Sequence, residues 1–316
     1  MRPTRAKLAG MQPPRLSAPQ GALHRARRGA AALACAFVTL LACLPAHAHD
    51  TLVLSTRAGA PYDEMAASAV RHLAAAQFNG TRAILDQPGW QDLARRNELL
   101  VGVGTRADAA LRAAQPRAAV VGCGVLRPLA GPAVRLEHSH VARVRLVRQV
   151  LPGARVLGLL SGTDARHADL DAFRRAAADV GLQLLVRRVA PGASVDEALA
   201  GLADQVDALS VTFDLDIGNP EASRRVMLYS YQNRIPVFGL TEAWARAGAL
   251  AALEWDWPDM GRQCADLALR VARSPQPVAE MQFPRASPYV LSRRAADYFR
   301  VTLSAELVRG ARRVLD

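Results

Sequence analysis

The chain has 316 residues, 51% of them hydrophobic, and a formal net charge of +12. Its length leaves room for two ordinary domains. Seven of the 40 basic residues and none of the 28 acidic ones lie in residues 1–28, so the chain from residue 49 on has 33 basic and 28 acidic residues, or +5. This mild balance excludes nucleic-acid binding driven by charge alone.

The N-terminus has the pattern of a secretory signal. The basic residues precede an apolar run at 30–44, Pro45 breaks the run, and Ala46-His47-Ala48 provides small residues at the positions that a signal peptidase reads. We therefore expect a signal peptide at 1–48, cleavage near Ala48 and a periplasmic mature protein. In an alternative interpretation, Leu40-Leu41-Ala42-Cys43 resembles a bacterial lipobox, which would make Cys43 a lipidated first residue.

Short apolar runs then alternate with amphipathic stretches. We expect strands at 52–54, 99–103 and 118–121, and helices at 61–76, 106–114 and 141–150. The alternation restarts after Pro152-Gly153, with strands at 155–160, 184–189, 208–212 and 235–239, helices at 170–180, 195–203 and 222–232, and one or two helices within 295–314. Alternation of this kind predicts parallel sheets with helices on both faces, and the restart indicates a second lobe.

The expected strands end in small or polar residues, and ligands of parallel α/β sheets gather beyond the carboxyl ends of strands. The candidate ligand-binding residues are Ser55, Thr56, Gly104, Thr105, Arg106, Gly124, Ser161, Thr163, Asp214, Thr241 and Glu242.

Gly104-Thr105 is the best candidate anion site among them. Glycine lets a ligand approach the backbone closely, and the free amide groups at the start of the following helix point towards it. Arg57 and Arg106 are further candidate partners of an acidic ligand. The competing interpretation is that the glycines only make a tight turn from strand to helix and that the arginines are solvated.

Asp214 and Asp216 are candidate partners of a cationic group such as an amine. Of the two we prefer Asp214 as the residue that contacts the ligand. The competing interpretation is that Asp216 or Asn219 caps the next helix while Asp214 is a solvated loop residue.

The sequence gives little indication of metal binding or of catalysis. Glu137-His138-Ser139-His140 has metal-ligand residue types, but Ser139 as the N-cap of the helix at 141–150 explains the segment more simply. The motifs of serine hydrolases and zinc proteases are absent from the sequence, so we expect neither an enzyme nor a cofactor. Cys123 and Cys264 are expected to be two separate buried thiols.

Trp255 and Trp257 flank Asp256 and would face the same side of a strand. They would either stack on an aromatic or planar ligand or, as we favour, bury area at the hinge or at the surface of a lobe.

The segment from Val206 to Gln263 resembles the C-terminal half of the periplasmic substrate-binding proteins of ABC transporters, in the family that includes tryptophan- and tyrosine-binding members. The shared order is a buried strand followed by Asp214 and Asp216, a helix, a strand ending at Gly239, Thr241-Glu242, an Ala-rich segment and Gly261-Arg262-Gln263. The resemblance implies the type I periplasmic-binding fold, an α/β architecture with two lobes, each a parallel sheet flanked by helices, and a ligand cleft between them.

The resemblance also implies that the chain crosses back after about Thr241, so that 249–273 packs with the first lobe. We expect lobe 1 to comprise 49–151 plus 245–282, and lobe 2 to comprise 152–244 plus 283–316.

The implied function is an extracytoplasmic solute-binding protein of an ABC-type uptake system, which closes its lobes over a small ligand. Its implied partners are an ABC permease and a cytoplasmic ATPase, and we expect a monomer that binds no nucleic acid. Family likeness implies ligand contact for Thr105 and an acidic position at Asp214, although Phe-Asp-Leu-Asp replaces the Thr-Asp pair of tryptophan binders.

An amino acid or a similar zwitterion follows from an anion site in one lobe and an acid in the other; an aromatic ligand follows only from the relatives. Two other classes remain open: a periplasmic ligand sensor or partner of a membrane sensor kinase or another uptake system and, more remotely, a cleft hydrolase.

Overall fold

The computed structural model describes residues 49–316 apart from 115, 127–130, 163–166, 191–192, 214–216, 218 and 277. The expected signal peptide and the alternative lipobox both lie outside the described residues. Within the described part of the chain, none of the helices combines the length and apolar character that crossing a membrane requires.

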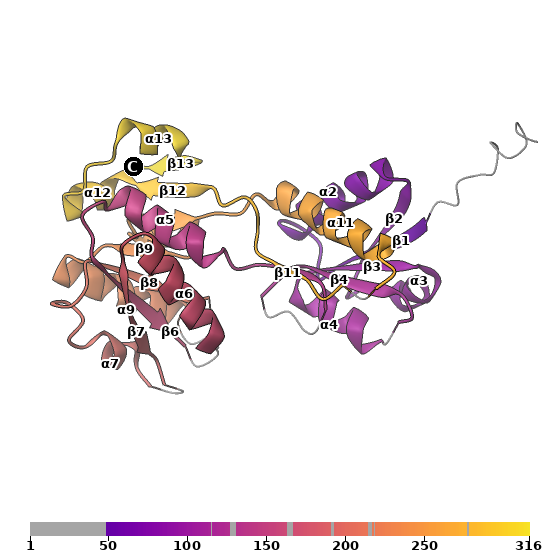
Figure 1. Ribbon diagram of the computed structural model, residues 1–316, viewed down its shortest axis with the longest axis horizontal. Coiled ribbons are helices and arrows are strands. Elements are labelled where there is room, and N and C mark those ends of the chain that lie inside the picture. Colours follow the sequence, from indigo (N-terminus) through magenta and orange to yellow (C-terminus); the bar gives the residue numbers. More distant parts are fainter. Residues whose placement is uncertain are drawn as a thin grey trace, which may run out of the picture. The chain divides into compact units, whose positions relative to one another are not determined.

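The first sheet has six strands, which pair in parallel in the order β11-β5-β4-β3-β1-β2 (Figure 1). One face is covered by α2 (Tyr62–Ala75) and α11 (Trp257–Arg273), and the other by α3 (Trp90–Arg96) and α4 (Thr105–Ala113). The strands are β1 (His49–Ser55), β2 (Phe78–Ile84), β3 (Leu99–Val103), β4 (Ala119–Val125), β5 (Ala133–Arg135) and β11 (Met281–Gln282).

The second sheet has seven strands in the order β13-β12-β10-β9-β8-β6-β7, and only β10 and β12 pair antiparallel. The two sheets confirm the predicted α/β class with helices on both faces of parallel sheets. The strands are β6 (Val156–Ser161), β7 (Gln183–Arg188), β8 (Ala208–Val211), β9 (Val237–Gly239), β10 (Ala251–Leu253), β12 (Tyr289–Ser292) and β13 (Arg313–Leu315).

Two separate hydrophobic cores cover the faces of the second sheet. The helices α5 (His140–Val150), α6 (His167–Asp179), α12 (Arg293–Phe299) and α13 (Ala305–Gly310) contribute to one core. The helices α7 (Val195–Leu199), α9 (Pro220–Asn233) and α10 (Glu242–Ala247) contribute to the other. Because strands between two such layers are buried on both sides, they read as continuous apolar runs in the sequence.

The direction in which strands are added reverses once in each sheet. In the first sheet the reversal falls between β1 and β3, and in the second between β6 and β8. Loops diverge at such a point and leave a crevice at the carboxyl ends of the two strands, which is where open α/β sheets bind ligands. The topology therefore places Ser55-Thr56 beside Gly104, and Ser161 beside Thr212.

The change from one sheet to the other falls at different residues from those expected. Helix α5, expected in lobe 1, packs through Val144 and Val147 into the core that contains Phe173 of α6. Strand β10 lies within 249–273, but it pairs with β9 of the second sheet; only α11 of that segment returns to the first sheet. Backbone pairing and side-chain packing, which local sequence patterns do not reveal, set these boundaries.

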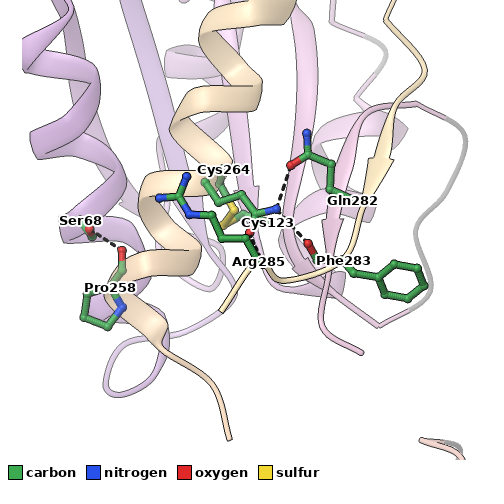
Figure 2. Close-up of a disulfide and its surroundings, with 8 residues drawn as sticks. Ser68, Cys123, Pro258, Cys264, Gln282, Phe283 and Arg285 are labelled. Carbon is green, nitrogen blue, oxygen red and sulfur yellow. Dashed lines mark hydrogen bonds between the residues drawn. A yellow bond between two sulfur atoms is a disulfide. The ribbon is translucent and has the colours of Figure 1, made fainter. Parts of the chain in front are cut away.

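A disulfide joins the returning helix to the first sheet. Cys123 of β4 and Cys264 of α11 are bonded, are fully buried and lie 141 residues apart in the sequence (Figure 2). The expectation of two separate thiols is therefore wrong. It failed because a strand end and a helix interior from distant parts of the chain come together only when α11 packs on the sheet.

Helix α11 is also fixed by close packing and by polar contacts. A Cβ on Gly261 would lie 2.3 Å from the carbonyl oxygen of Met65 in α2, so only glycine permits this approach. The Ser68 hydroxyl donates to the carbonyl oxygen of Pro258 at 2.7 Å. The side-chain amide of Gln263 donates to the carbonyl oxygen of Phe283 at 2.9 Å.

We predict that removing the disulfide destabilises the protein without changing its fold. A crosslink that closes a loop of this length restricts the unfolded chain and contributes about 3 kcal/mol or more to the free energy of unfolding. The double variant Cys123→Ala/Cys264→Ala should unfold at a lower denaturant concentration than the oxidised protein. As a control, reductant should lower the midpoint of the wild-type protein and leave that of the double variant unchanged; equal sensitivity of the two would contradict the prediction.

Candidate functional site

The carboxyl edge of the first sheet brings together the sequence-predicted residues Ser55, Thr56, Gly104, Thr105 and Gly124. The Gly104 amide donates to the carbonyl oxygen of Cys123 at 2.8 Å, which places the end of β3 against β4. Three neighbouring strands therefore supply this edge, as the predicted topology requires.

The two threonine hydroxyls at this edge already have partners within the protein. The Thr56 hydroxyl donates to the carbonyl oxygen of Val103 at 3.0 Å and accepts from the Ala107 amide at 3.2 Å. The Thr105 hydroxyl accepts from the Leu126 amide at 3.1 Å. Thr56 is buried, whereas Thr105 is exposed, so Thr56 mainly positions the start of α4 and Thr105 is the more accessible of the two.

Gly104 has a conformation and a packing environment that favour glycine. Its φ is +89°, in the region that side-chain-bearing residues rarely adopt. A Cβ at this position would lie 2.6 Å from both Thr56 Oγ1 and Tyr62 Cε1. Gly104 thus makes a tight turn from strand to helix, and ligand contact at the same edge stays a prediction.

The two candidate arginines near this edge have other contacts. Arg106 forms an exposed ion pair of 3.2 Å with Asp86. The guanidinium of Arg57 lies 5.4 Å from the centre of the Tyr62 ring. Ligand binding by either residue stays a prediction.

In the second sheet, Ser161 and Glu242 also have internal partners. Ser161 is fully buried and its hydroxyl donates to the carbonyl oxygen of Gly162 at 3.2 Å. Glu242 pairs with Arg246 at 2.5 Å and with Arg313 at 2.6 Å. Thr241 is the N-cap residue of α10.

The remaining candidates of this lobe, Thr163 and Asp214, lie outside the described residues, as does Asp216. Asn219 caps α9 by accepting from the Ala222 amide at 2.9 Å. This is one of the two caps that the sequence suggested for that helix.

Three segments, 136–139, 254–256 and 283–288, carry the chain between the two sheets. We call them the crossing segments. The Trp255 indole nitrogen donates to the carbonyl oxygen of Leu136 at 2.6 Å. The Glu254 amide donates to the carbonyl oxygen of Pro288 at 2.7 Å, and Nδ1 of His138 lies 3.0 Å from the hydroxyl oxygen of Ser287. Each crossing segment is thus hydrogen-bonded to both others.

Trp255 is the centre of this arrangement. Its ring stacks with the rings of His138 (centroids 5.2 Å apart) and Trp257 (4.9 Å), and the Phe213 ring approaches edge-on at 6.0 Å. Only 6% of Trp255 is exposed. This ring therefore stabilises the crossing segments and is not available to stack on a ligand, which agrees with the interpretation that we favoured for it.

In the Glu137–His140 segment His138 is buried and His140 is partly buried, and both are neutral at pH 7. Desolvation, reinforced by the nearby positive charge of Arg143, lowers the pKa of both His138 and His140 to about 4. The His140 ring stacks on Phe173 at 4.8 Å. Ser139 caps α5 by accepting from the Ala142 amide at 3.1 Å, as predicted. The described residues contain no group of three or more potential metal ligands.

A small cavity lies at the carboxyl ends of β8, β9 and β10, and sequence reasoning did not find it. Its volume is ≈ 30 Å³. Arg143, Glu137 and Ser210 give it a polar side, and Phe213 and Leu240 contribute to an apolar one. A signal existed in the sequence, since Arg143 lies three, four and seven residues before Leu146, Val147 and Val150 and so shares their apolar helix face.

Two parallel sheets, each covered by helices on both faces and joined by three crossing segments, define the type I periplasmic-binding class of fold. The chain belongs to the ABC transporter substrate-binding protein family, whose sequence profile matches residues 80–315. No protein of curated function matches the chain in sequence.

Solved structures support the same class of fold. A domain from Streptococcus pneumonia in complex with L-Trp has a TM-score of 0.55 and 18% identity, and a conserved domain protein from Vibrio cholerae has the same values. A ligand-free, open substrate-binding protein with adhesive properties from Clostridium difficile has a TM-score of 0.63 and 14% identity. Each match covers 84% of this chain and 99% of the other.

We predict that Gly104→Ala is much more destabilising than Gly59→Ala. Both glycines have a φ near +90°, but a Cβ on Gly59 meets nothing within 4 Å. Gly59→Ala should therefore lower the free energy of unfolding only by the cost of the left-handed backbone conformation, about 1 kcal/mol. Gly104→Ala adds two close contacts and should cost about 2–4 kcal/mol in the free energy of unfolding. Urea unfolding of the two variants measures the difference, and equal costs would show that the edge relaxes freely around Gly104.

We also predict that the protein loses stability as the pH falls from about 6.5 towards 4. The folded-state pKa of His138 and His140 lies below the unfolded value, so in this window the unfolded chain binds protons that the folded chain does not. The free energy of unfolding should fall by on the order of 3 kcal/mol per histidine at most. Above pH 7 both histidines are neutral in the folded and in the unfolded chain, so the free energy of unfolding should not depend on them there.

The measurement is urea unfolding between pH 4 and 8. The double variant His138→Gln/His140→Gln has no imidazole at these positions and should show a flatter profile. A profile as steep as that of the wild-type protein would assign the acid sensitivity to other groups.

Proposed function

We propose that this protein is the extracytoplasmic solute-binding component of an ABC-type uptake system. In this proposal it captures a small solute by closing its two lobes and presents it to a permease that a cytoplasmic ATPase drives. The family match over residues 80–315 supports solute binding. We place the mature protein in the periplasm, because the first 48 residues have the signal-peptide pattern.

The observation that carries the proposal is the equivalence of the two sheet edges. Each sheet reverses its strand order once, and each reversal has a threonine hydroxyl that contacts the carbonyl oxygen of the neighbouring strand. In the first sheet Thr56 contacts Val103, and in the second Thr212 contacts Leu160 at 3.4 Å. Two such edges provide two half-sites, and a solute held by both favours the closed state over the open one.

We propose an amino acid or a similar small zwitterion as the ligand. An L-Trp complex with the same class of fold supports this class of solute. Binding and release of such a ligand requires polar contacts and the exclusion of water, but no nucleophile or general base. We therefore assign the protein a transport role rather than a catalytic one.

A thermal-shift screen of the chain from residue 49 on tests this proposal. The screen should contain amino acids, aromatic acids, purines, sugars and short peptides. A solute present at 100 times its Kd should stabilise the protein by about 2.7 kcal/mol and raise the melting temperature by a few degrees. The absence of a shift with every solute in the screen would overturn the solute-binding proposal and favour a role in binding a protein partner.

Asp214→Asn and Asp216→Asn form a matched pair for any amine-containing ligand that the screen finds. Residues two apart in an extended segment share a face, so geometry alone does not separate the two carboxylates; the family resemblance assigns the ligand contact to Asp214. Only Asp214→Asn should then weaken binding, and the expected loss is about 10-fold or more for a charge-assisted hydrogen bond. Equal losses in the two variants would contradict the assignment of Asp214.

A further inference from the structure

Arg143 is a partly buried cation at the carboxyl edge of the second sheet. Its Nη2 donates to the Ser210 hydroxyl at 2.8 Å and to the carbonyl oxygen of Val211 at 2.5 Å. Its guanidinium carbon lies 4.6 Å from the centre of the Phe173 ring. Desolvation lowers its pKa to about 10, which leaves it charged at neutral pH. The side chain is thus held in one orientation by groups at the end of β8 and on α6.

No carboxylate of the described residues forms an ion pair with Arg143. Glu137 is the acid whose negative charge acts on Arg143. The Glu137 carboxylate, however, forms its ion pair with Arg135. Arg135 also lies 3.6 Å from Asp169. Partial burial favours a paired anion for a guanidinium, because less water is left to compensate its charge. Among the described residues its Nε and Nη1 groups donate to no acceptor, since both of its hydrogen bonds come from Nη2, so these donors remain for an external anion.

The cavity beside Arg143 has the size of one small polar group. With a volume of ≈ 30 Å³ it holds about two water molecules, which is enough for a carboxylate and too little for a whole amino acid. Ser210 adds a hydroxyl to the polar side, while Phe213, Phe238 and Leu240 make the rest apolar. An apolar lining excludes competing water and strengthens a charge-assisted hydrogen bond.

We infer that this cavity is a subsite for the carboxylate of the solute, and that Arg143 is the residue that binds it. The inference rests on the proposed solute-binding function and specifies its ligand: a carboxylic acid with an apolar group next to the carboxylate. Arg143 and Ser210 supply the donors, and Glu137 retains acceptor sites for an adjacent ammonium group. The carboxylate of the ligand then binds at the edge of the second sheet. The sequence-based expectation instead placed the anion at Gly104-Thr105 of the first sheet.

Arg148 provides a matched control on the same helix. It donates to four backbone carbonyl oxygens, those of Val180, Pro152, Ala154 and Gly181. Like Arg143 it joins α5 to neighbouring segments, but it does not line the cavity. A purely structural role for Arg143 would make the two substitutions equivalent in their effect on binding.

The experiment compares carboxylic acids with their primary amides. The probes are L-phenylalanine and L-phenylalaninamide, L-leucine and L-leucinamide, indole-3-acetate and indole-3-acetamide, and isovalerate and isovaleramide. Binding is measured by thermal shift and calorimetry on wild-type protein, Arg143→Gln, Arg143→Lys and Arg148→Gln. We expect one or more acids to bind at least about 10-fold more tightly than the matching amides.

Arg143→Gln should lose about 10- to 100-fold in affinity for the acid, and Arg143→Lys less, because a lysine keeps the charge but not the planar pair of donors. Arg148→Gln should lower the melting temperature yet keep the affinity. Amides that bind as well as acids, or an acid that Arg143→Gln binds undiminished, would overturn the carboxylate subsite while leaving the solute-binding proposal intact. If amines, sugars or purines bind and no acid does, the subsite alone is overturned; if nothing binds, both proposals are.

If Arg143→Gln does not fold, Arg143→Lys decides the question. An acid affinity that falls in Arg143→Lys and is unchanged in Arg148→Gln supports the subsite. Unchanged affinity in both variants overturns it.

Discussion

The hydrogen bond from the Trp255 indole to Leu136 is the contact on which the rest of the structure depends. Both lobes are assembled from segments that are distant in the sequence, so three separate crossings must converge. Trp255 buries its ring against His138 and Trp257 while its N–H satisfies a backbone carbonyl, and the carbonyl oxygen of Trp255 itself accepts from Arg312 at 2.8 Å. A large aromatic ring with one polar atom suits such a junction, because it combines apolar burial with a directional contact.

The carboxyl edges of the two sheets use their polar side chains differently. At the first edge, hydroxyl side chains and glycines bring β1, β3 and α4 into contact. The polar side chains there therefore stabilise the fold. At the second edge Arg143 reaches from α5 to the end of β8, and the cavity beside it is lined largely by apolar side chains. The two edges are topologically equivalent but chemically different, so in the proposed closed state they would contact different parts of the solute.

Local sequence patterns predicted the strands with long apolar runs, including the edge strand β7, but missed shorter strands such as β10 and β12. Apolar runs such as 99–103 and 155–160 correspond to β3 and β6, which have neighbours on both sides. Strand β2 lies at an edge and has a single buried residue, so its sequence lacks an apolar run. Strands β11 and β13 have only two and three residues and form only because a partner strand is already in place.

The sequence by itself determined the α/β class, the Ser139 cap and the small residues at the strand ends, because each depends on spacing within a few residues. Tertiary structure decided the pairing of Cys123 with Cys264, the burial of Trp255 and the contact of Arg143 with Ser210. Arg143 and Ser210 lie 67 positions apart in the sequence, and Cys123 and Cys264 lie 141 positions apart. The burial of Trp255 depends on contacts that are similarly distant in the sequence. Nothing in the local pattern of either partner specifies the other, and only the packing of helices on the completed sheets brings them together.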